Sequence, residues 1–252
     1  MFDLTGKAAL VTGGNSGLGR AMAAALAAAG ASVAVAGRNQ DRNTAVAAEL
    51  AGLGVRTAAV QADVRDAGSC RAMIEEAAGH LGRLDILINN AGTNIRKAPE
   101  TFTLDQWREV LETNLTSVFV TSQAIYPHLK RSGGGKIVNI GSMLSIFGAP
   151  FAAPYGASKG GVVQLTKGLA TAWAKDNIQV NAVLPGWIDT PLTEQARVDV
   201  DGLYDRVLAR TPAGRWGAPE DLAGIAVFLS SRASDFITGA AIPVDGGYSA
   251  QG

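Results

Sequence analysis

Short apolar segments alternate with longer amphipathic or alanine-rich segments along the whole 252-residue chain. The apolar segments show little polar alternation, which is typical of strands buried on both faces of a parallel sheet. They predict strands at residues 8–11, 32–35, 57–60, 84–88, 136–140, 178–183 and 241–244. Pro243 lies in the last segment, and because proline lacks a backbone donor, this strand is expected at a sheet edge or a strand end.

The longer segments predict helices at residues 17–29, 41–53, 67–80, 104–131, 155–174 and 219–230. Regular alternation of strand and helix indicates an α/β fold with a Rossmann-type, doubly wound parallel sheet and helices on both faces. No internal repeat or low-complexity linker interrupts the pattern. We therefore expect residues 1–252 to form a single domain.

Composition narrows the function classes. Apolar residues make up 47% of the chain and charged residues 17%, a balance that excludes intrinsic disorder. Lys plus Arg and Asp plus Glu both number 22, so the net charge is zero and nothing favours nucleic-acid binding. The single cysteine, Cys70, excludes an intrachain disulfide and a cysteine zinc cluster, and two histidines argue against a histidine metal site. No metal is expected.

No targeting or membrane segment is predicted. The first residues lack a basic region followed by an apolar one. The longest uncharged stretch, residues 137–158, is interrupted by polar residues and by Pro150 and Pro154, whereas a bilayer helix needs about 20 mostly apolar residues. A cytoplasmic protein that does not bind membranes is the expectation.

The first predicted strand runs directly into a glycine-rich turn, residues 12–19, with the sequence TGGNSGLG. Glycines let a backbone turn tightly and approach a pyrophosphate, and the following helix offers free N–H groups. The alternative is a simple tight turn, but the first strand of a doubly wound sheet is where dinucleotides bind. The predicted cofactor-binding residues here are Gly13, Asn15, Ser16, Gly17, Leu18 and Gly19.

The ends of later strands extend this prediction. Asp63 and Val64 follow the third strand, where a carboxylate can accept hydrogen bonds at the adenine edge or simply cap the next helix. The segment 89–92 follows the fourth strand, and its Asn90, Ala91 and Gly92 are predicted to bind the cofactor or to shape a turn. All three segments fall at the carboxyl edge of the sheet, where open α/β proteins bind ligands.

The end of the second strand indicates which cofactor is bound. NAD-dependent proteins usually place Asp or Glu there to bind the ribose 2′-OH. In this chain that position is Gly37, and Arg38, which can pair with a phosphate, follows it. Arg42 at the start of the next helix is a second candidate. The sequence predicts NADP(H) as the preferred cofactor and NAD(H) as the alternative, with a solvated Arg38 as the competing interpretation.

A second group of residues is suited to acid–base chemistry. Tyr155 and Lys159 are four residues apart, so they project from one face of a predicted helix. A nearby ammonium stabilises phenolate and lowers the tyrosine pKa, which is otherwise about 10. Ser142 ends the fifth predicted strand and can hydrogen-bond a substrate oxygen. Asn114 lies in the predicted helix 104–131 and can hold a relay water. Each has a structural alternative: a surface tyrosine, a capping serine, a helix kink.

These segments resemble the short-chain dehydrogenase/reductase family along essentially the whole chain. The matching segments are residues 12–19, Asp63 with Val64, 89–92, Asn114, Ser142, Tyr155 with Lys159, 185–190 and 243–247. The resemblance implies a seven-stranded parallel sheet, hydride transfer between a nicotinamide cofactor and a secondary alcohol or ketone, and a homotetramer formed through the helices near 104–131 and 155–174. The alternative class is a dinucleotide-binding regulator without catalytic activity. The presence of all four candidate catalytic residues, Asn114, Ser142, Tyr155 and Lys159, argues against it.

The resemblance also implies individual roles. Tyr155 is the acid/base, Ser142 orients the substrate oxygen, and Lys159 holds the nicotinamide ribose while lowering the tyrosine pKa. Asn114 completes a proton relay. The segment 185–190 holds the nicotinamide carboxamide, with the participating residues Pro185, Gly186, Ile188 and Thr190.

Within this family, residues 90–97 and 212–222 resemble sugar-acid dehydrogenases acting on gluconate or 2-deoxygluconate. The alternatives are a 3-oxoacyl-carrier-protein reductase and a cyclic ketone reductase. Arg96 follows the fourth strand closely enough to reach the pocket rim and bind an anionic substrate, or to remain a solvated loop residue. The segment 190–212 is expected to form a substrate lid, and its mixed composition does not discriminate between these substrates.

Overall fold

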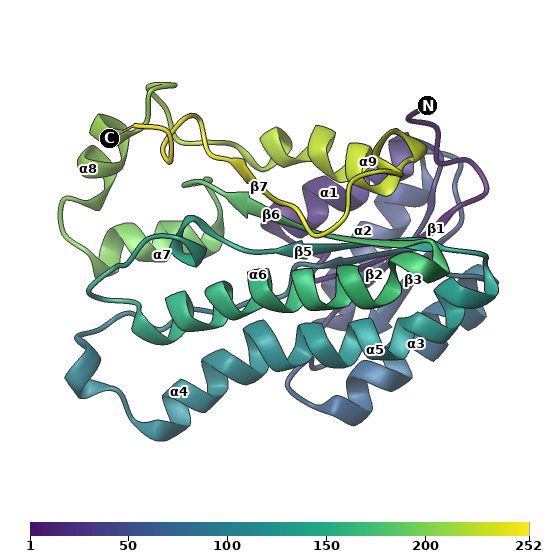
Figure 1. Cartoon of the computed structure of the whole chain (residues 1–252), viewed down its shortest axis with the longest axis horizontal. Coiled ribbons are helices and arrows are strands. Elements are labelled where there is room, and N and C mark those ends of the chain that lie inside the picture. Colours follow the sequence, from purple (N-terminus) through teal and green to yellow (C-terminus); the bar gives the residue numbers. More distant parts are fainter. Residues whose placement is uncertain (252) are drawn as a thin grey trace.

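The computed structural model describes residues 1–251 and contains a seven-stranded parallel sheet in the order β3-β2-β1-β4-β5-β6-β7 (Figure 1). The strands are β1 (Ala8–Thr12), β2 (Ser32–Gly37), β3 (Thr57–Gln61), β4 (Ile86–Asn89), β5 (Gly135–Ile140), β6 (Ile178–Pro185) and β7 (Ala241–Val244). Strand order reverses direction between β1 and β4, and the carboxyl ends at this switch point form a crevice in such sheets. The predicted parallel α/β fold is confirmed.

Helices cover both faces of the sheet (Figure 1). They are α1 (Gly17–Ala28), α2 (Gln40–Ala51), α3 (Ala67–Leu81), α4 (Leu104–Leu111), α5 (Ser117–Arg131), α6 (Ala153–Trp173), α7 (Pro191–Asp199), α8 (Leu203–Arg210) and α9 (Ala223–Ser230). Successive β1 residues point to opposite faces: Val11 packs with α1, α2 and α9, and Leu10 packs with α3, α5 and α6. Both faces are apolar, which explains the continuous apolar runs in the sequence.

Two parts of the fold differ from the sequence-based expectation. The predicted helix 104–131 is interrupted by a π-helical turn, Glu112–Thr116, which separates α4 from α5. The expected lid contains two helices, α7 and α8, which project beyond the carboxyl edge of the sheet (Figure 1). They pack around Trp216 through Ala196, Leu203 and Val207.

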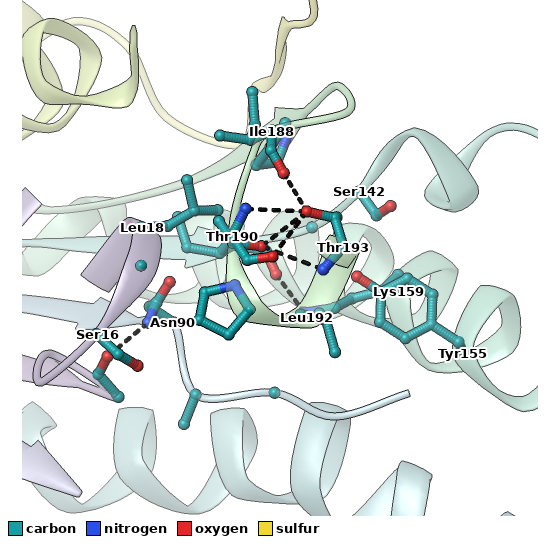
Figure 2. A pocket seen from close by; sticks show the side chains of 18 of the residues that line it. Ser16, Leu18, Asn90, Ser142, Tyr155, Lys159, Ile188, Thr190, Leu192 and Thr193 are labelled. Atoms are coloured by element: carbon teal, nitrogen blue, oxygen red, sulfur yellow. Dashed lines mark hydrogen bonds between the residues drawn. The ribbon is translucent and has the colours of Figure 1, made fainter. Parts of the chain in front are cut away.

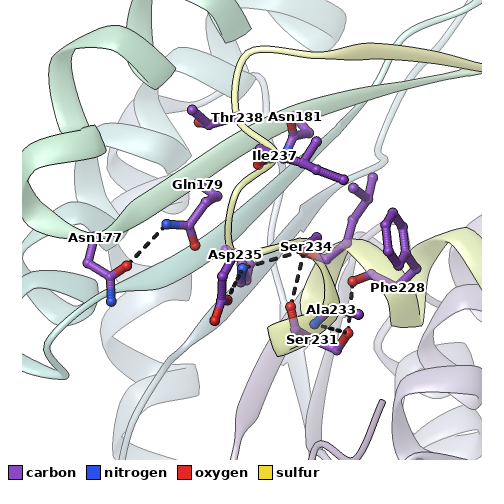
Figure 3. Close-up of polar contacts among 12 residues, drawn as sticks. Asn177, Gln179, Asn181, Phe228, Ser231, Ala233, Ser234, Asp235, Ile237 and Thr238 are labelled. Carbon is purple, nitrogen blue, oxygen red and sulfur yellow. Dashed lines mark hydrogen bonds and ion pairs between the residues drawn. The ribbon is translucent and has the colours of Figure 1, made fainter. Parts of the chain in front are cut away.

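The segment that leads into the edge strand β7 is hydrogen-bonded to β6. The Asn181 amide donates to the Ile237 carbonyl oxygen at 2.8 Å and accepts from the Ala240 N–H at 3.1 Å. The Val180 N–H donates to the Thr238 hydroxyl at 3.2 Å. Figure 3 shows Asn181, Ile237 and Thr238 close together beside β6. The expectation that Pro243 lies in an edge strand is confirmed.

Candidate active site

A cavity of about 230 Å³ lies at the carboxyl edge of the sheet. Figure 2 shows Ser16, Leu18 and Asn90 on one side and Ser142, Tyr155 and Lys159 on the other. The structure therefore brings together residues that are far apart in the sequence, from Gly13 to Thr193. The predicted residues that line this cavity are Gly13, Ser16, Gly17, Leu18, Asn90, Ala91, Gly92, Ser142, Tyr155, Lys159, Pro185, Gly186, Ile188 and Thr190.

The glycine-rich turn forms one wall of the cavity, and its backbone conformation requires glycine at positions 13, 17 and 19. Gly13 and Gly17 have positive φ angles of 62° and 48°. A Cβ atom at Gly19 would overlap the carbonyl oxygen of Gly13 and lie 2.5 Å from the Asn90 amide nitrogen. That amide donates to the carbonyl oxygens of Thr12 and Gly13 at 3.0 and 3.2 Å. Asn90 thereby fixes the turn against the end of β4.

Tyr155 and Lys159 lie one turn apart on α6. The Lys159 ammonium nitrogen is 5.7 Å from the centre of the Tyr155 ring and donates a 2.7 Å hydrogen bond to the Ile140 carbonyl oxygen. Lys159 is only 4% exposed, and among the described residues it forms no ion pair. Burial lowers the pKa of Lys159 to about 8, because removal from water destabilises the charged amine.

The electrostatics of Tyr155 correct a sequence-based expectation. Burial raises the pKa of the phenol, while a hydrogen bond with Ser142 and the positive charge of Arg96 act in the opposite direction. The expected lowering of the tyrosine pKa by Lys159 is not found, because desolvation is the largest influence. Ser142 also accepts a 3.1 Å hydrogen bond from the Leu144 N–H, so it caps the short turn that follows β5 as well as lining the cavity.

Asn114 lies in the π turn and is fully buried. Its amide exchanges hydrogen bonds with the Thr93 backbone at 2.8 and 2.9 Å and donates to the Ser158 hydroxyl at 3.1 Å. Ser158 in turn donates to the Tyr155 carbonyl oxygen at 2.7 Å. Asn114 does not line the cavity. Its Oδ1 atom nevertheless retains a second lone pair, and π turns are frequent at functional sites.

A second cavity of about 230 Å³ adjoins the first at Gly13 and Ser16. The predicted residues Asn15, Arg38, Asp63 and Val64 all line it, and Arg42 does not. Arg65, in the same loop, forms an ion pair with the Asp63 carboxylate, and the distance between Nη2 and Oδ2 is 2.6 Å. Hydrogen bonding from Arg65 lowers the pKa of Asp63. The Asp63 carboxylate is thus already engaged within the protein.

Arg96 lies in a smaller cavity of about 70 Å³, which Ser142, Tyr155 and Trp187 also line. Its side chain is 6% exposed, so the alternative of a solvated loop arginine is wrong. The guanidinium pairs with Asp199 at 3.2 Å and donates to the Leu192 carbonyl oxygen at 3.0 Å. Both partners lie on α7, so Arg96 ties the loop after β4 to the expected lid.

A family profile described as "Enoyl-(Acyl carrier protein) reductase" matches residues 13–249. The chain belongs to the short-chain dehydrogenase/reductase family. This family member is 43% identical to the 2-dehydro-3-deoxy-D-gluconate 5-dehydrogenase of Dickeya dadantii (strain 3937), over 99% of this chain and 98% of that protein. It is 41% identical to the gluconate 5-dehydrogenase of Gluconobacter oxydans (strain 621H), over 98% of this chain and 96% of that protein.

The short-chain dehydrogenase/reductase is also similar to the crystal structure of a gluconate 5-dehydrogenase from Burkholderia cenocepacia J2315 in complex with NADP and tartrate. The TM-score is 0.95 and the sequence identity 40%, over 100% of this chain and 98% of that chain. The recognised family and the sugar-acid subgroup expected from residues 90–97 and 212–222 agree with these relatives.

Several residues that shape the site of this family member were not predicted from its sequence. Thr193 donates to the Ile188 carbonyl oxygen and interacts with Thr190, as Figure 2 shows. Arg65 holds Asp63, and the Asn94 Oδ1 atom is buried without a partner among the described residues. The ion pair of Asp63 and Arg65 could have been predicted, because the two residues are only two positions apart in the sequence. The other contacts depend on the tertiary fold.

Within residues 1–251, no helix of this short-chain dehydrogenase/reductase is long and apolar enough to cross a bilayer. The same residues contain no cluster of three side chains suited to hold a metal ion.

Proposed function

We propose that this protein is an NADP(H)-dependent oxidoreductase that interconverts a secondary alcohol and a ketone on a sugar acid such as gluconate. The observation that carries the proposal is the convergence of Ser142, Tyr155 and Lys159 on one cavity whose opposite wall is a glycine-rich turn. The sugar-acid dehydrogenases among the relatives support the substrate class.

The residues present fit a dinucleotide. A Cβ atom at Gly13 or Gly19 would press against Asn90 or the Gly13 backbone, so glycine keeps this turn tight. The turn and the first residues of α1 line the cavity, where backbone N–H groups suit a pyrophosphate. Arg38 lines the adjoining cavity at the end of β2, and the residue before it, Gly37, carries no carboxylate to repel a 2′-phosphate. The NADP in the Burkholderia relative supports this cofactor, with NAD(H) as the alternative. When bound, the nicotinamide donates or accepts the hydride.

The protein side chains supply orientation and the proton. The Ser142 hydroxyl donates to the substrate oxygen and holds it beside Tyr155. The Tyr155 phenol gives its proton to that oxygen during ketone reduction and takes it back during alcohol oxidation. The Lys159 ammonium, 5.7 Å from the centre of the Tyr155 ring, would donate to the cofactor ribose. Asn114 accepts a hydrogen bond from a water that links Lys159 to solvent. Ile188 and Thr190 bind the carboxamide beside Pro185 and Gly186.

Arg96 favours a sugar acid over the two alternatives, the 3-oxoacyl-carrier-protein and cyclic ketone substrates. Its side chain lines the same small cavity as Ser142 and Tyr155. Two of its five N–H groups bond Asp199 and Leu192, and the others are left to donate to a substrate carboxylate. We expect Arg96→Ala to raise KM for gluconate about tenfold or more, since a hydrogen bond to a charged group is worth roughly 1.5–3 kcal/mol. An unchanged KM for gluconate would favour the neutral-ketone alternatives.

The direct test of the reaction class is Tyr155→Phe. This change removes only the hydroxyl, so NADPH binding measured by fluorescence titration should persist while turnover falls about 10²–10⁴-fold. Tyr126→Phe is the matched control, because Tyr126 bonds Asp176 away from the cavity. Near-wild-type turnover of Tyr155→Phe would disprove the assignment.

We further propose that the chain acts as one catalytic domain in the cytoplasm, with residues 190–212 as the lid and a homotetramer as the assembly. Residue 252, the end of that domain, lies outside the described residues. Exposed Leu104, Trp107 and Phe119 on α4 and α5 support packing between subunits. Sedimentation at micromolar concentration should show a tetramer, and a strictly monomeric profile would exclude it.

A further inference from the structure

The end of β2 is occupied by a side chain from another segment. A Cβ atom at Gly37 would lie 2.5 Å from the Asn15 amide nitrogen and 3.0 Å from the Asn43 Oδ1 atom. The amide of Asn15, from the glycine-rich turn, thus fills the space that a side chain at position 37 would enter. Asn15, Gly37 and Arg38 all line the second cavity.

Asn43 on α2 fixes this arrangement. It is 0% exposed, and its amide nitrogen donates to the carbonyl oxygens of Gly37 and Val60, both at 2.8 Å. These two bonds join the ends of β2 and β3 and use the amide N–H groups. The Asn43 Oδ1 atom therefore faces Asn15 and accepts a 2.6 Å hydrogen bond from its amide nitrogen. Moving Asn15 aside would leave a buried acceptor without a donor, which is unfavourable.

We propose that Asn43 is a specificity-determining positioning residue: it holds the Asn15 amide over Gly37, so that an amide donor occupies the place at the end of β2 where a side chain of residue 37 would lie. The inference rests on the proposed NADP(H) dependence. A primary amide has two N–H groups, so Asn15 retains one donor beside Arg38. Donors and a positive charge suit a 2′-phosphate, whereas the carboxylate of an NAD-selective site binds the ribose 2′-OH and repels phosphate.

A mutant cycle on cofactor binding tests the proposal. Dissociation constants of NADPH and NADH are measured by fluorescence titration for wild type, Gly37→Asp, Asn15→Ala and the double variant. Gly37→Asp alone should weaken both cofactors, because its side chain collides with Asn15. The double variant should regain NADH binding and shift the preference toward NADH by about tenfold or more relative to wild type. A Gly37→Asp protein that already prefers NADH would overturn the role of Asn15 and Asn43.

A second measurement needs no cofactor and so separates this inference from the cofactor proposal. Gly37→Ala should lower Tm by about 3 °C or more in the wild-type background and by much less in the Asn15→Ala background. Equal losses in both backgrounds would overturn the contact. If the coupling is present but wild type binds NADH more tightly than NADPH, the proposed cofactor fails while the arrangement of Asn15 over Gly37 stands.

The Asn43→Leu variant tests directly whether Asn43 positions the Asn15 amide. Without the Asn43 acceptor, the Asn15 amide is free to turn, so the preference for NADPH over NADH should fall about tenfold. The melting temperature of each variant shows that folded protein is compared. An unchanged preference in a folded Asn43→Leu protein would contradict the proposal.

Discussion

Two buried lysines lie at opposite ends of β5, and only one of them has a carboxylate partner. Lys136, near the start of the strand, is 8% exposed and pairs with Asp235 at 2.7 Å. Lys159 bonds the carbonyl oxygen of Ile140 at the end of the same strand. It forms no ion pair with any described residue. Figure 3 shows Asp235 beside Ser234, and neither residue lines the cavity of Figure 2.

The two lysines differ in what balances the effect of burial on the pKa. Burial lowers the pKa of Lys136, but the hydrogen bond and charge of Asp235 oppose this effect. Nothing comparable opposes burial at Lys159, and its pKa falls to about 8. An uncompensated cation is unfavourable for folding, and at Lys159 this cation lies 5.7 Å from the centre of the Tyr155 ring. The unpaired lysine therefore lies where the proposed reaction takes place, and the paired one holds the segment after α9 against the sheet.

The largest expected effect comes from Lys159→Met. Turnover should fall at least about 10²-fold because the reaction site loses the cation beside Tyr155 and the proposed donor to the ribose. Stability near pH 7 should rise by up to roughly 3 kcal/mol, the equivalent of lowering a pKa from 10.5 to about 8.

The pH dependence follows from the sign of that shift. A lowered lysine pKa means that the unfolded state binds more protons between about pH 8 and 10.5, so wild-type stability rises through this range. The advantage of Lys159→Met, measured by urea unfolding, should shrink accordingly. A destabilised Lys159→Met protein at pH 7 would contradict the comparison.

A smaller effect is expected from Asp235→Asn, which leaves the Lys136 ammonium without its carboxylate. Stability should fall by about 1–2 kcal/mol, less than for a fully buried pair because the Asp235 side chain is 55% exposed. kcat should not change, since the pair lies at the other end of β5. A large loss of turnover without loss of stability would show that the two ends are coupled.

The smallest effect is expected from Lys136→Met, the matched control for Lys159→Met. The substitution removes the unfavourable desolvation of the Lys136 ammonium together with its ion pair. Because Asp235 is partly exposed, water solvates its carboxylate instead, so the free energy of unfolding should change by no more than about 1 kcal/mol. Activity should stay at the wild-type level. A loss of activity similar to that of Lys159→Met would remove the distinction between the two lysines.

The sequence predicted most of the fold because its signals are local. Both faces of β1 are buried, so its residues form a continuous apolar run, and the spacing of Tyr155 and Lys159 places them on one helix face. The π turn at Glu112–Thr116 was not predictable, since apolar periodicity continues through it. Nor was the pairing of Arg96 with Asp199, which joins residues 103 positions apart. The pKa direction of Tyr155 depends on burial, which spacing alone does not reveal.

The most direct test is an NMR titration of the lysine side chains in protein labelled with ¹³C at Cε. The Lys159→Met and Lys136→Met variants assign the two buried amines. The predicted result is that Lys159 titrates near pH 8 and Lys136 at a higher pH, because only Lys136 has a carboxylate partner. A Lys159 signal that titrates near 10.5, the ordinary value for a lysine, would contradict the account of an unpaired buried cation at the reaction site.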